Sequence, residues 1–400
     1  MNTTTQIDTP LPNRVASKTE VDLVSSSPSD RDFARPEVTL DTSRTPKSGT
    51  NRQGGESSSL RIIFMGTPDF AVASLRMLVE NHYNVVAVVT MPDKPVGRHH
   101  DTLQASPVKE YAVEQGIPVL QPERLKDEAF IEELRSYRAD LQVVVAFRML
   151  PEVVWAMPPM GTFNLHAALL PQYRGAAPIN WAVINGETET GVTTFFLDHQ
   201  IDTGRIIHRV STPIAETDTV GDVHDRLMAL GSDLVLKTVQ DIEAGNVQTV
   251  EQEHIIDELG LMNHENRERS SSLLKPAPKL FKENTQIRWS RHTVKSAYDF
   301  IRGLSPYPAA WTTLRTADGK ETQLKVFFAE KVESNEELRL MNDESRTQSS
   351  LIIRDSSILV PLSDGYIRLT DIQLAGKRRM SVADFLRGAH LDGAVLVEVE

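Results

Sequence analysis

The sequence predicts an α/β protein in which a doubly wound sheet is followed by a small β-barrel, after a disordered N-terminal tail. In residues 60–244, short apolar runs alternate with amphipathic helical patterns, which is the order of a doubly wound sheet. In residues 310–374, several short strand-like runs are separated by polar turns, as in a small barrel. Residues 1–59 are rich in Ser, Thr, Pro, Asp and Asn and lack periodic apolar residues, which predicts disorder.

Length and composition limit the classes of protein to be considered. A chain of 400 residues is long for one domain, so we expect a first domain at residues 60–250, a linker at 251–274 and a second domain at 275–400. No stretch reaches the roughly 18 uninterrupted apolar residues of a membrane span, and the tail has no apolar signal region. The absence of cysteine excludes disulfides and cysteine nucleophiles. We therefore expect a cytoplasmic protein. A monomer is also expected, but it does not follow from these features.

The first strand, turn and helix begin the doubly wound pattern. Residues 60–65 are a compact apolar run ended by Gly66, which predicts a buried parallel strand. Thr67 is then a candidate helix N-cap, with Pro68 at the first helical position. The next strand is expected at residues 85–90. Because the turn lacks a G-x-G-x-x-G pattern, a dinucleotide site is not indicated.

The remaining elements follow from the same signals of periodicity and punctuation. In the first domain we expect a polar loop at 92–106, helices at 106–115, 127–137, 176–185 and 220–244, and strands at 119–120, 141–147, 192–197 and 205–213. In the second domain we expect a helix at 293–304 and strands near 310–314, 324–330, 351–354, 358–361 and 365–374.

The stretch with most chemical information is residues 161–175, GTFNLHAALLPQYRG. Asn164 and His166 are two apart, so on an extended strand their side chains point the same way. Asp202 follows a further apolar stretch, in the sequence IDTG. An amide, an imidazole and a carboxylate at neighbouring strand ends suit attack on a carbonyl, because they can stabilise an oxyanion, move protons and orient the imidazole. A lone histidine is more often structural, so the prediction depends on all three residues.

The motif NLHAALLPQYRGAAP followed by IDTG resembles the 10-formyltetrahydrofolate-dependent formyltransferases. Their shared pattern is Asn-x-His, a Ser-Leu-Leu-Pro-like loop with Tyr-Arg-Gly, and Asp-Thr-Gly. RIIFMGTPDFAVASL, MPDKPVGR, SPVKEYA, AAPINWAVINGETETGVT and QLAGKRRMS are similar to the members that act on methionyl-tRNA, so the likeness covers about residues 60–390. It implies a Rossmann-like catalytic domain and an OB-like C-terminal barrel.

The resemblance also implies the reaction. A formyl group would pass from 10-formyltetrahydrofolate to the α-amine of methionine on initiator tRNA, in translation initiation. Asn164, His166 and Asp202 would be the catalytic residues. No metal is expected, because nothing nearby completes a site with His99, His100 and Asp101.

Contact residues for folate are implied in two segments. One is the loop Ala168, Leu169, Leu170 and Pro171, in which Ala168 replaces the more usual serine. The other follows the central strand and consists of Phe147, Arg148, Met149 and Leu150. Here Arg148 stands near the usual glycine of an Ala-Tyr-Gly-x-Ile-Leu-Pro pattern and the segment is one residue shorter, so the folate contacts remain open. Asp198 matches a second acidic position, with a structural or pterin-side role.

Contact residues for tRNA are implied by local basic groups on a chain whose net charge is −12. Lys94 and Arg98 lie in the polar loop, and Lys377, Arg378 and Arg379 form a cluster in the second domain. Each of these residues could instead be a solvated charge. Clustered on an acidic protein, they fit a surface that follows a phosphate backbone.

Other functions remain open at the level of sequence. Within the same family, the alternative is a formyltransferase for a small amine, such as glycinamide ribonucleotide or a nucleotide-linked amino sugar. The basic residues favour tRNA. A folate-binding hydrolase that releases formate belongs to another class. A non-enzymatic RNA-binding module would leave the pattern of Asn164, His166 and Asp202 unexplained.

Overall fold

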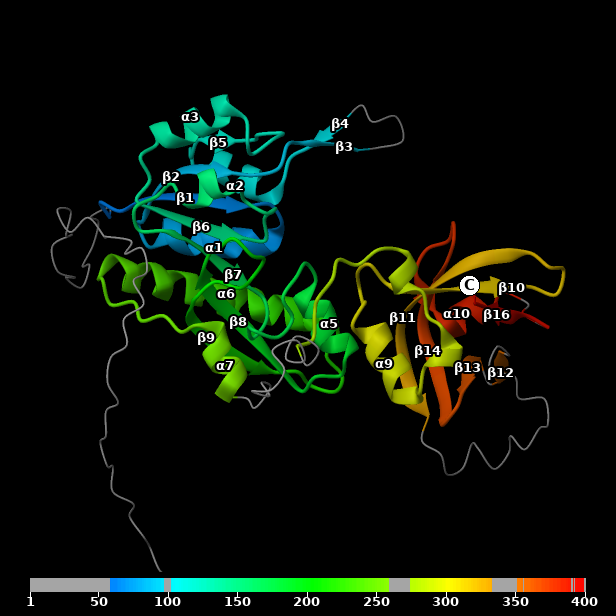
Figure 1. The fold of residues 1–400 in the computed structure, drawn as a ribbon. Helices are drawn as coiled ribbons and strands as arrows, with labels where there is room; N and C mark the ends of the chain where they lie inside the picture. Colours follow the sequence, from blue (N-terminus) through cyan, green and yellow to red (C-terminus); the bar gives the residue numbers. More distant parts are fainter. Residues whose placement is uncertain are drawn as a thin grey trace, which may run out of the picture. The chain divides into compact units, whose positions relative to one another are not determined.

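The computed structural model describes residues 58–96, 102–258, 274–332, 351–354, 356–389, 391 and 393–398. The tail predicted to be disordered therefore lies almost wholly outside the described residues. The described chain forms two large sheets and one short hairpin (Figure 1). Among the helices in these ranges, none combines the length and the hydropathy that a membrane-spanning helix requires.

The first sheet has seven strands in the order β5-β2-β1-β6-β7-β8-β9. Their bounds are β1 (Arg61–Gly66), β2 (Asn84–Val89), β5 (Val119–Leu120), β6 (Leu141–Val145), β7 (Thr162–His166), β8 (Glu189–Phe196) and β9 (Ile206–Pro213). In this order the neighbours among β5, β2, β1, β6 and β7 pair in parallel, whereas β8 and β9 form an antiparallel edge. The chain runs from β1 outward to β2 and β5 and then returns to β6, so the strand order reverses between β1 and β6. The predicted doubly wound sheet is confirmed.

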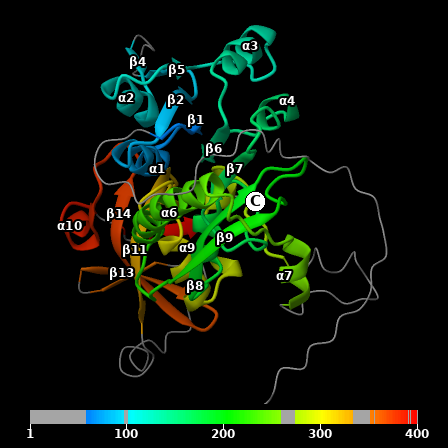
Figure 2. The same cartoon turned by 90° about the vertical axis from the view of Figure 1, so that its left-hand side faces the viewer.

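Helices cover both faces of this sheet. Residues Ile62 and Phe64 of β1 pack in a core with helices α1 (Asp69–Glu80), α2 (Pro107–Glu114) and α6 (Val220–Glu243). The alternate residues Ile63 and Met65 pack with α3 (Glu128–Ser136) and α4 (Glu152–Trp155). Figure 2 shows α1 and α3 on opposite sides of the sheet. This alternation explains the continuous apolar runs of the parallel strands.

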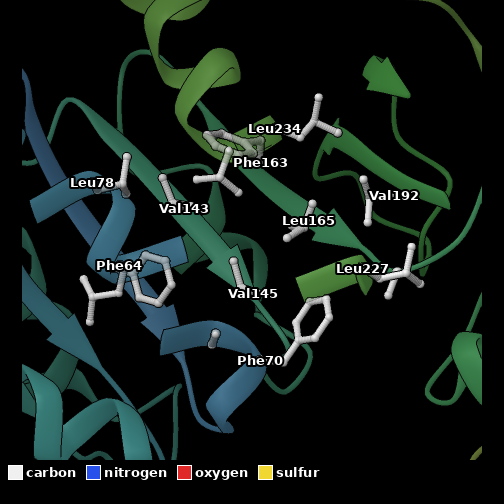
Figure 3. Packing of buried hydrophobic residues seen from close by; sticks show 14 of the residues in the cluster. Phe64, Phe70, Leu78, Val143, Val145, Phe163, Leu165, Val192, Leu227 and Leu234 are labelled. Atoms are coloured by element: carbon white, nitrogen blue, oxygen red, sulfur yellow. The ribbon is translucent and has the colours of Figure 1, made fainter. Parts of the chain in front are cut away.

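Figure 3 shows the first of these two cores. Strand residues there lie against residues of α1 and α6, and those labelled include Phe64, Val143, Phe163, Leu165, Leu78, Leu227 and Leu234. Leu165 is 3% exposed in this core. Because neighbours along a strand face opposite ways, its burial here directs Asn164 and His166 to the other face of β7.

Two local features differ from prediction. Helix α1 begins at Asp69 with Pro68 as its N-cap, so Thr67 does not cap it. The polar loop at residues 92–106 contains a hairpin of β3 (Lys94–Val96) and β4 (Thr102–Gln104), which projects from the sheet in Figure 1. Strand propensity does not predict these three-residue strands, because the hairpin is polar and short.

A carboxylate anchors the base of the hairpin. Asp93 accepts hydrogen bonds from Lys109 Nζ at 2.6 Å and from Gln121 Nε2 at 2.8 Å. The bond from Lys109, reinforced by Gln121, lowers the pKa of Asp93. The base of the hairpin is thus tied to α2 and to the chain after β5.

The segment predicted as a linker contains helix α7 (Gln252–Glu258). Beyond it, Ala277 is fully buried and packs in the core of the first sheet. Helix α5 (Pro178–Ile184) lies between β7 and β8 in the chain. The core of the first sheet therefore includes residues on both sides of the predicted boundary at residue 275.

The second sheet is antiparallel, with the order β12-β13-β14-β11-β10-β16 and β15 paired to β14. Its strands are β10 (Ala310–Arg315), β11 (Glu321–Val332), β12 (Ile352–Arg354), β13 (Ser357–Leu362), β14 (Gly365–Leu374), β15 (Met380–Ser381) and β16 (Val395–Val397). The helical segments of the same part of the chain are η2 (Glu283–Thr285), η3 (Trp289–Arg291), α9 (Val294–Arg302) and α10 (Val382–Leu386). A register shift around Phe328 interrupts the pairing of β11 with β14, and such bulges bend a sheet. Among the described residues, the end strands β12 and β16 do not pair, so the predicted barrel is a curled half-barrel.

Candidate active site

A cavity of about 660 Å³ lies at the carboxyl ends of β1, β6 and β7. This is where the strand order reverses, which is the usual ligand position in doubly wound sheets. Its volume lies in the range of small-molecule sites. Apolar and polar side chains share the lining, among them Phe147, Met149, Leu150, Trp155, Leu197, Asn164, His166, Asp198 and Asp202.

The three residues predicted to be catalytic line this one cavity. Asn164 and His166 project from the same face of β7, as the spacing of two predicts. Asp202 reaches the cavity from the turn between β8 and β9. The Asn164 amide makes no hydrogen bond to any other residue that the structure describes, so its N–H groups are free to bind a substrate oxygen.

The orientation of His166 is set by a backbone carbonyl. The ring is 5% exposed, and its Nε2 lies 2.8 Å from the carbonyl oxygen of Tyr173. Since a carbonyl can only accept, Nε2 must carry a proton, and Nδ1 is left facing Asp202. The distance from Nδ1 to Asp202 Oδ2 is 3.9 Å, which is an ion-pair distance rather than a hydrogen bond. The orienting bond therefore comes from Tyr173 and not, as expected, from Asp202.

The Asp202 carboxylate is held by the loop that follows β7. Its Oδ2 accepts a hydrogen bond from the backbone N–H of Gly175 at 2.9 Å. Gly175 has a φ of +129°, and a Cβ there would lie 2.3 Å from the carbonyl oxygen of Ala277. Only glycine fits this close approach, so the glycine at this position serves the carboxylate.

The side chain of Tyr173 anchors the same loop. Its hydroxyl donates to Glu187, which also pairs with Lys275, and its backbone N–H donates to the Lys275 carbonyl at 2.7 Å. Burial raises the pKa of Tyr173, and the bond to Glu187 acts in the same direction. The hydroxyl therefore stays protonated and keeps donating, which holds the carbonyl that orients His166.

The two predicted folate segments lie in different places. Phe147, Arg148, Met149 and Leu150 all line the cavity. Met149 is 69% exposed, so it lies at the mouth. Arg148 donates to the carbonyls of Glu123, at 2.9 Å, and Pro122, which ties this shortened segment to the chain after β5. Burial lowers the pKa of Arg148.

The loop of Ala168, Leu169, Leu170 and Pro171 does not line the cavity. Ala168 and Leu170 are fully buried. Thr193 of β8 donates to the Ala168 carbonyl at 2.7 Å and accepts from the Leu170 N–H at 3.2 Å. The structure thus gives this loop a packing role beneath the site, and the folate contact implied for it has no support here.

Several residues at the cavity carried no sequence signal. Trp155 and His199 meet edge to face with their ring centroids 5.3 Å apart, and Phe70 and His224 do the same at 5.3 Å. These residues come from α4, the chain after β8, α1 and α6. A short motif cannot reveal them, because only the fold brings such distant positions together.

The residues predicted to contact tRNA differ in whether their charged groups are exposed or engaged in an ion pair. Lys94 is exposed on β3, whereas Arg98 lies outside the described residues. Lys377 and Arg378 are exposed before β15, and neither side chain has a partner in the part of the chain that the structure describes. Arg379 forms an ion pair with Asp371 at 2.8 Å and lies over the Phe327 ring. No cluster of metal-ligand side chains occurs within the described ranges.

Comparison with known proteins gives consistent matches over this fold. Residues 60–239 match the formyl transferase family model, and residues 279–390 match the model of the formyl transferase C-terminal domain. The chain is 57% identical over 335 residues to the methionyl-tRNA formyltransferase of Parabacteroides distasonis, covering 83% of this chain and 97% of the relative. It is 61% identical over 333 residues to that of Phocaeicola vulgatus, again covering 83% and 97%.

Among solved structures, an N-formyltransferase from Helicobacter canadensis, in complex with folinic acid and dTDP-3-aminofucose, has the same fold. The TM-score is 0.51 at 19% identity, covering 80% of this chain and all of that chain. At this identity the likeness extends to the fold alone. The shared fold therefore does not choose between a sugar amine and another acceptor.

Proposed function

This chain belongs to the methionyl-tRNA formyltransferase family, and from that membership we infer that its cavity transfers a formyl group to the α-amine of methionine carried by tRNA. The single observation that supports the site is the meeting of Asn164, His166 and Asp202 in one cavity at the strand reversal. The small-amine alternative has only a likeness of fold in its favour. Initiator tRNA is the acceptor we propose.

We propose 10-formyltetrahydrofolate as the formyl donor. The aromatic and aliphatic walls given by Phe147, Leu150 and Trp155 suit a flat bicyclic ring, and Asp198 offers a polar group at the same cavity. A structure of the same fold contains folinic acid, which supports a folate here. Residues 147–150 are the proposed contact segment.

We propose a task for each of the three side chains on the basis of this geometry. The neutral amine attacks the formyl carbon, and the free amide of Asn164 donates to the oxygen that becomes negative. His166 accepts through Nδ1 the proton that the amine loses, because Nε2 is engaged with Tyr173. It returns this proton to the departing nitrogen of the donor. Asp202, 3.9 Å from Nδ1, stabilises the ring while it is cationic.

The proposed function is tested by the choice of acceptor. Labelled formyl from 10-formyltetrahydrofolate is offered to charged initiator tRNA, charged elongator tRNA and glycinamide ribonucleotide in parallel. We expect rapid transfer to charged initiator tRNA and much slower transfer to the other two. Efficient transfer to the small amine, or release of formate without any acceptor, would contradict the proposal.

For tRNA we propose that Lys377 and Arg378 bind backbone phosphates. Replacing both by methionine is expected to raise KM for charged tRNA by about tenfold and to reduce the salt dependence by about two counterions. The KM for the folate should stay the same, because both residues lie outside the cavity. The measurement is a titration of charged tRNA at several salt concentrations.

The matched control removes two other exposed cations, Lys126 and Arg135, which lie next to and within α3. It has the same change in net charge. An equal rise in KM for both double variants would show that net charge alone is responsible, and would remove the assignment of Lys377 and Arg378.

A further inference from the structure

Gln252, the first residue of α7, has a fully buried side chain with four hydrogen bonds. Its Oε1 accepts from Arg174 Nε at 3.1 Å and from Arg174 Nη2 at 2.6 Å. Its Nε2 donates to the carbonyls of Asp202 and Gly204, both at 2.9 Å. Since arginine only donates and carbonyls only accept, the orientation of this amide is fixed by its partners.

These bonds join the loop that contacts His166 at the end of β7 to the turn that contains Asp202. Arg174 lies between Tyr173, whose carbonyl orients His166, and Gly175, whose N–H holds the Asp202 carboxylate. On the other side, Gln252 holds the backbone of Asp202 itself. Gln252 does not line the cavity, so it reaches the chemistry only through these turns.

Both turns contain a backbone conformation that needs support. Tyr173 has a φ of +61° and Asp202 a φ of +55°, and residues other than glycine adopt this left-handed region at a conformational cost. Such residues persist where surrounding contacts determine them. Gln252 bonds to Asp202 directly and to the residue that follows Tyr173.

A neutral amide suits this position better than a carboxylate. Burial lowers the pKa of Arg174, so its guanidinium requires good acceptors. Gln252 provides one without placing a second negative charge beside Asp202. Its NH₂ group also satisfies two carbonyls that a carboxylate would repel.

We propose that Gln252 is a positioning residue for formyl transfer: it fixes the separation between His166 Nδ1 and the Asp202 carboxylate. It does so by clamping the loop of residues 173–175, which contacts His166, to the turn that contains Asp202. The proposal depends on the roles assigned above to His166 and Asp202. It concerns geometry alone, because Gln252 does not line the cavity.

The test uses Gln252→Met in the full chain, with the single-turnover rate of formyl transfer measured at saturating donor and charged tRNA. We expect the rate to fall by about 10–100-fold, because small displacements of catalytic groups are costly, while both KM values stay within about threefold. In the background of Asp202→Asn, Gln252→Met should lower the rate little further. Both substitutions disrupt the same interaction, the placement of the Asp202 carboxylate beside His166, so their effects should not multiply. Folding is followed by circular dichroism and thermal unfolding.

Gln142→Met is the matched control. Gln142 is also fully buried, but it lies near the start of β6, where it accepts from Thr162 Oγ1 at 3.0 Å. Its replacement should leave the rate within about twofold of wild type. A folded Gln252→Met with a rate as high as that of the control overturns the proposal. The proposal is also overturned if the fold-loss in rate of the double variant equals the product of the fold-losses of Gln252→Met and Asp202→Asn.

Gln252→Glu covers the case in which the methionine variant does not fold. It keeps an acceptor for Arg174 and removes the donors to the Asp202 and Gly204 carbonyls, so a wild-type rate overturns the proposal and a slow, folded enzyme supports it. Asp202→Asn alone separates failure of the proposed function from failure of the role proposed for Gln252. Full activity of that variant contradicts the proposed function, whereas its slowness beside a wild-type rate for Gln252→Met contradicts only the role of Gln252.

Discussion

Replacement of His166 by alanine is expected to lower the single-turnover rate of formyl transfer by about 10²–10⁴-fold, the range for a positioned acid–base group. The reason is that His166 lines the cavity with its Nδ1 3.9 Å from the Asp202 carboxylate, while its other nitrogen is held by Tyr173. The rate is measured with labelled donor at saturating charged initiator tRNA, and the folded state by circular dichroism.

His208→Ala is the matched control for this prediction. His208 also pairs with a carboxylate, Asp241, at 2.7 Å, but on β9 and α6 and outside the cavity. Its loss should reduce stability and leave the rate unchanged. In addition, His166→Gln can still donate to the Tyr173 carbonyl but cannot carry a proton. Near-normal turnover by His166→Gln would show that the imidazole is needed only for packing.

Asn164→Ala is expected to lower the rate by about 10²–10³-fold, as is typical when one donor to an oxyanion is lost. Among the described residues the Asn164 amide has no protein partner, so its removal leaves no buried group unsatisfied and should cost little stability. The effect should therefore appear in the rate, with KM for the donor changed by no more than about threefold. Single-turnover and steady-state measurements together separate these two quantities.

Asn164→Asp provides the sharper comparison. Its side chain has the same shape but offers only acceptors and a negative charge to an oxygen that becomes negative. It should be at least as slow as Asn164→Ala. If Asn164→Ala instead raises KM alone, or if the aspartate variant is faster than the alanine variant, Asn164 binds the ground state and does not stabilise an oxyanion.

The sequence was informative where a signal is local. A period of two placed Asn164 and His166 on one face of β7, and the apolar runs predicted the parallel strands and their order of appearance. The helix expected at residues 106–115 is α2, which Ser106 caps by accepting from the Lys109 N–H just before a proline. Such features depend on a few neighbouring residues, so pattern and propensity are sufficient to find them.

The remaining site depends on contacts between distant residues or on the backbone. The bond that orients His166 uses the carbonyl of Tyr173, and every residue has such a carbonyl. Gln252 lies 50 positions after Asp202, at the start of a helix inside an expected linker. The folate contact implied for the loop Ala168–Leu169–Leu170–Pro171 stays a prediction, since Ala168 and Leu170 are buried and the loop is bonded to β8. Sequence patterns do not distinguish these cases.

The backbone pairing between the loop that follows β7 and residues 275–277 has a practical consequence for dividing the chain. The Tyr173 N–H bonds to the Lys275 carbonyl, the Ala277 N–H to the Arg174 carbonyl, and the Ala177 N–H to the Ala277 carbonyl. A fragment that stops at Leu274 would leave all three groups of the loop without these partners. Fragments designed for complementation or crystallisation should therefore keep the chain at least to Ala277 together with the loop that follows β7.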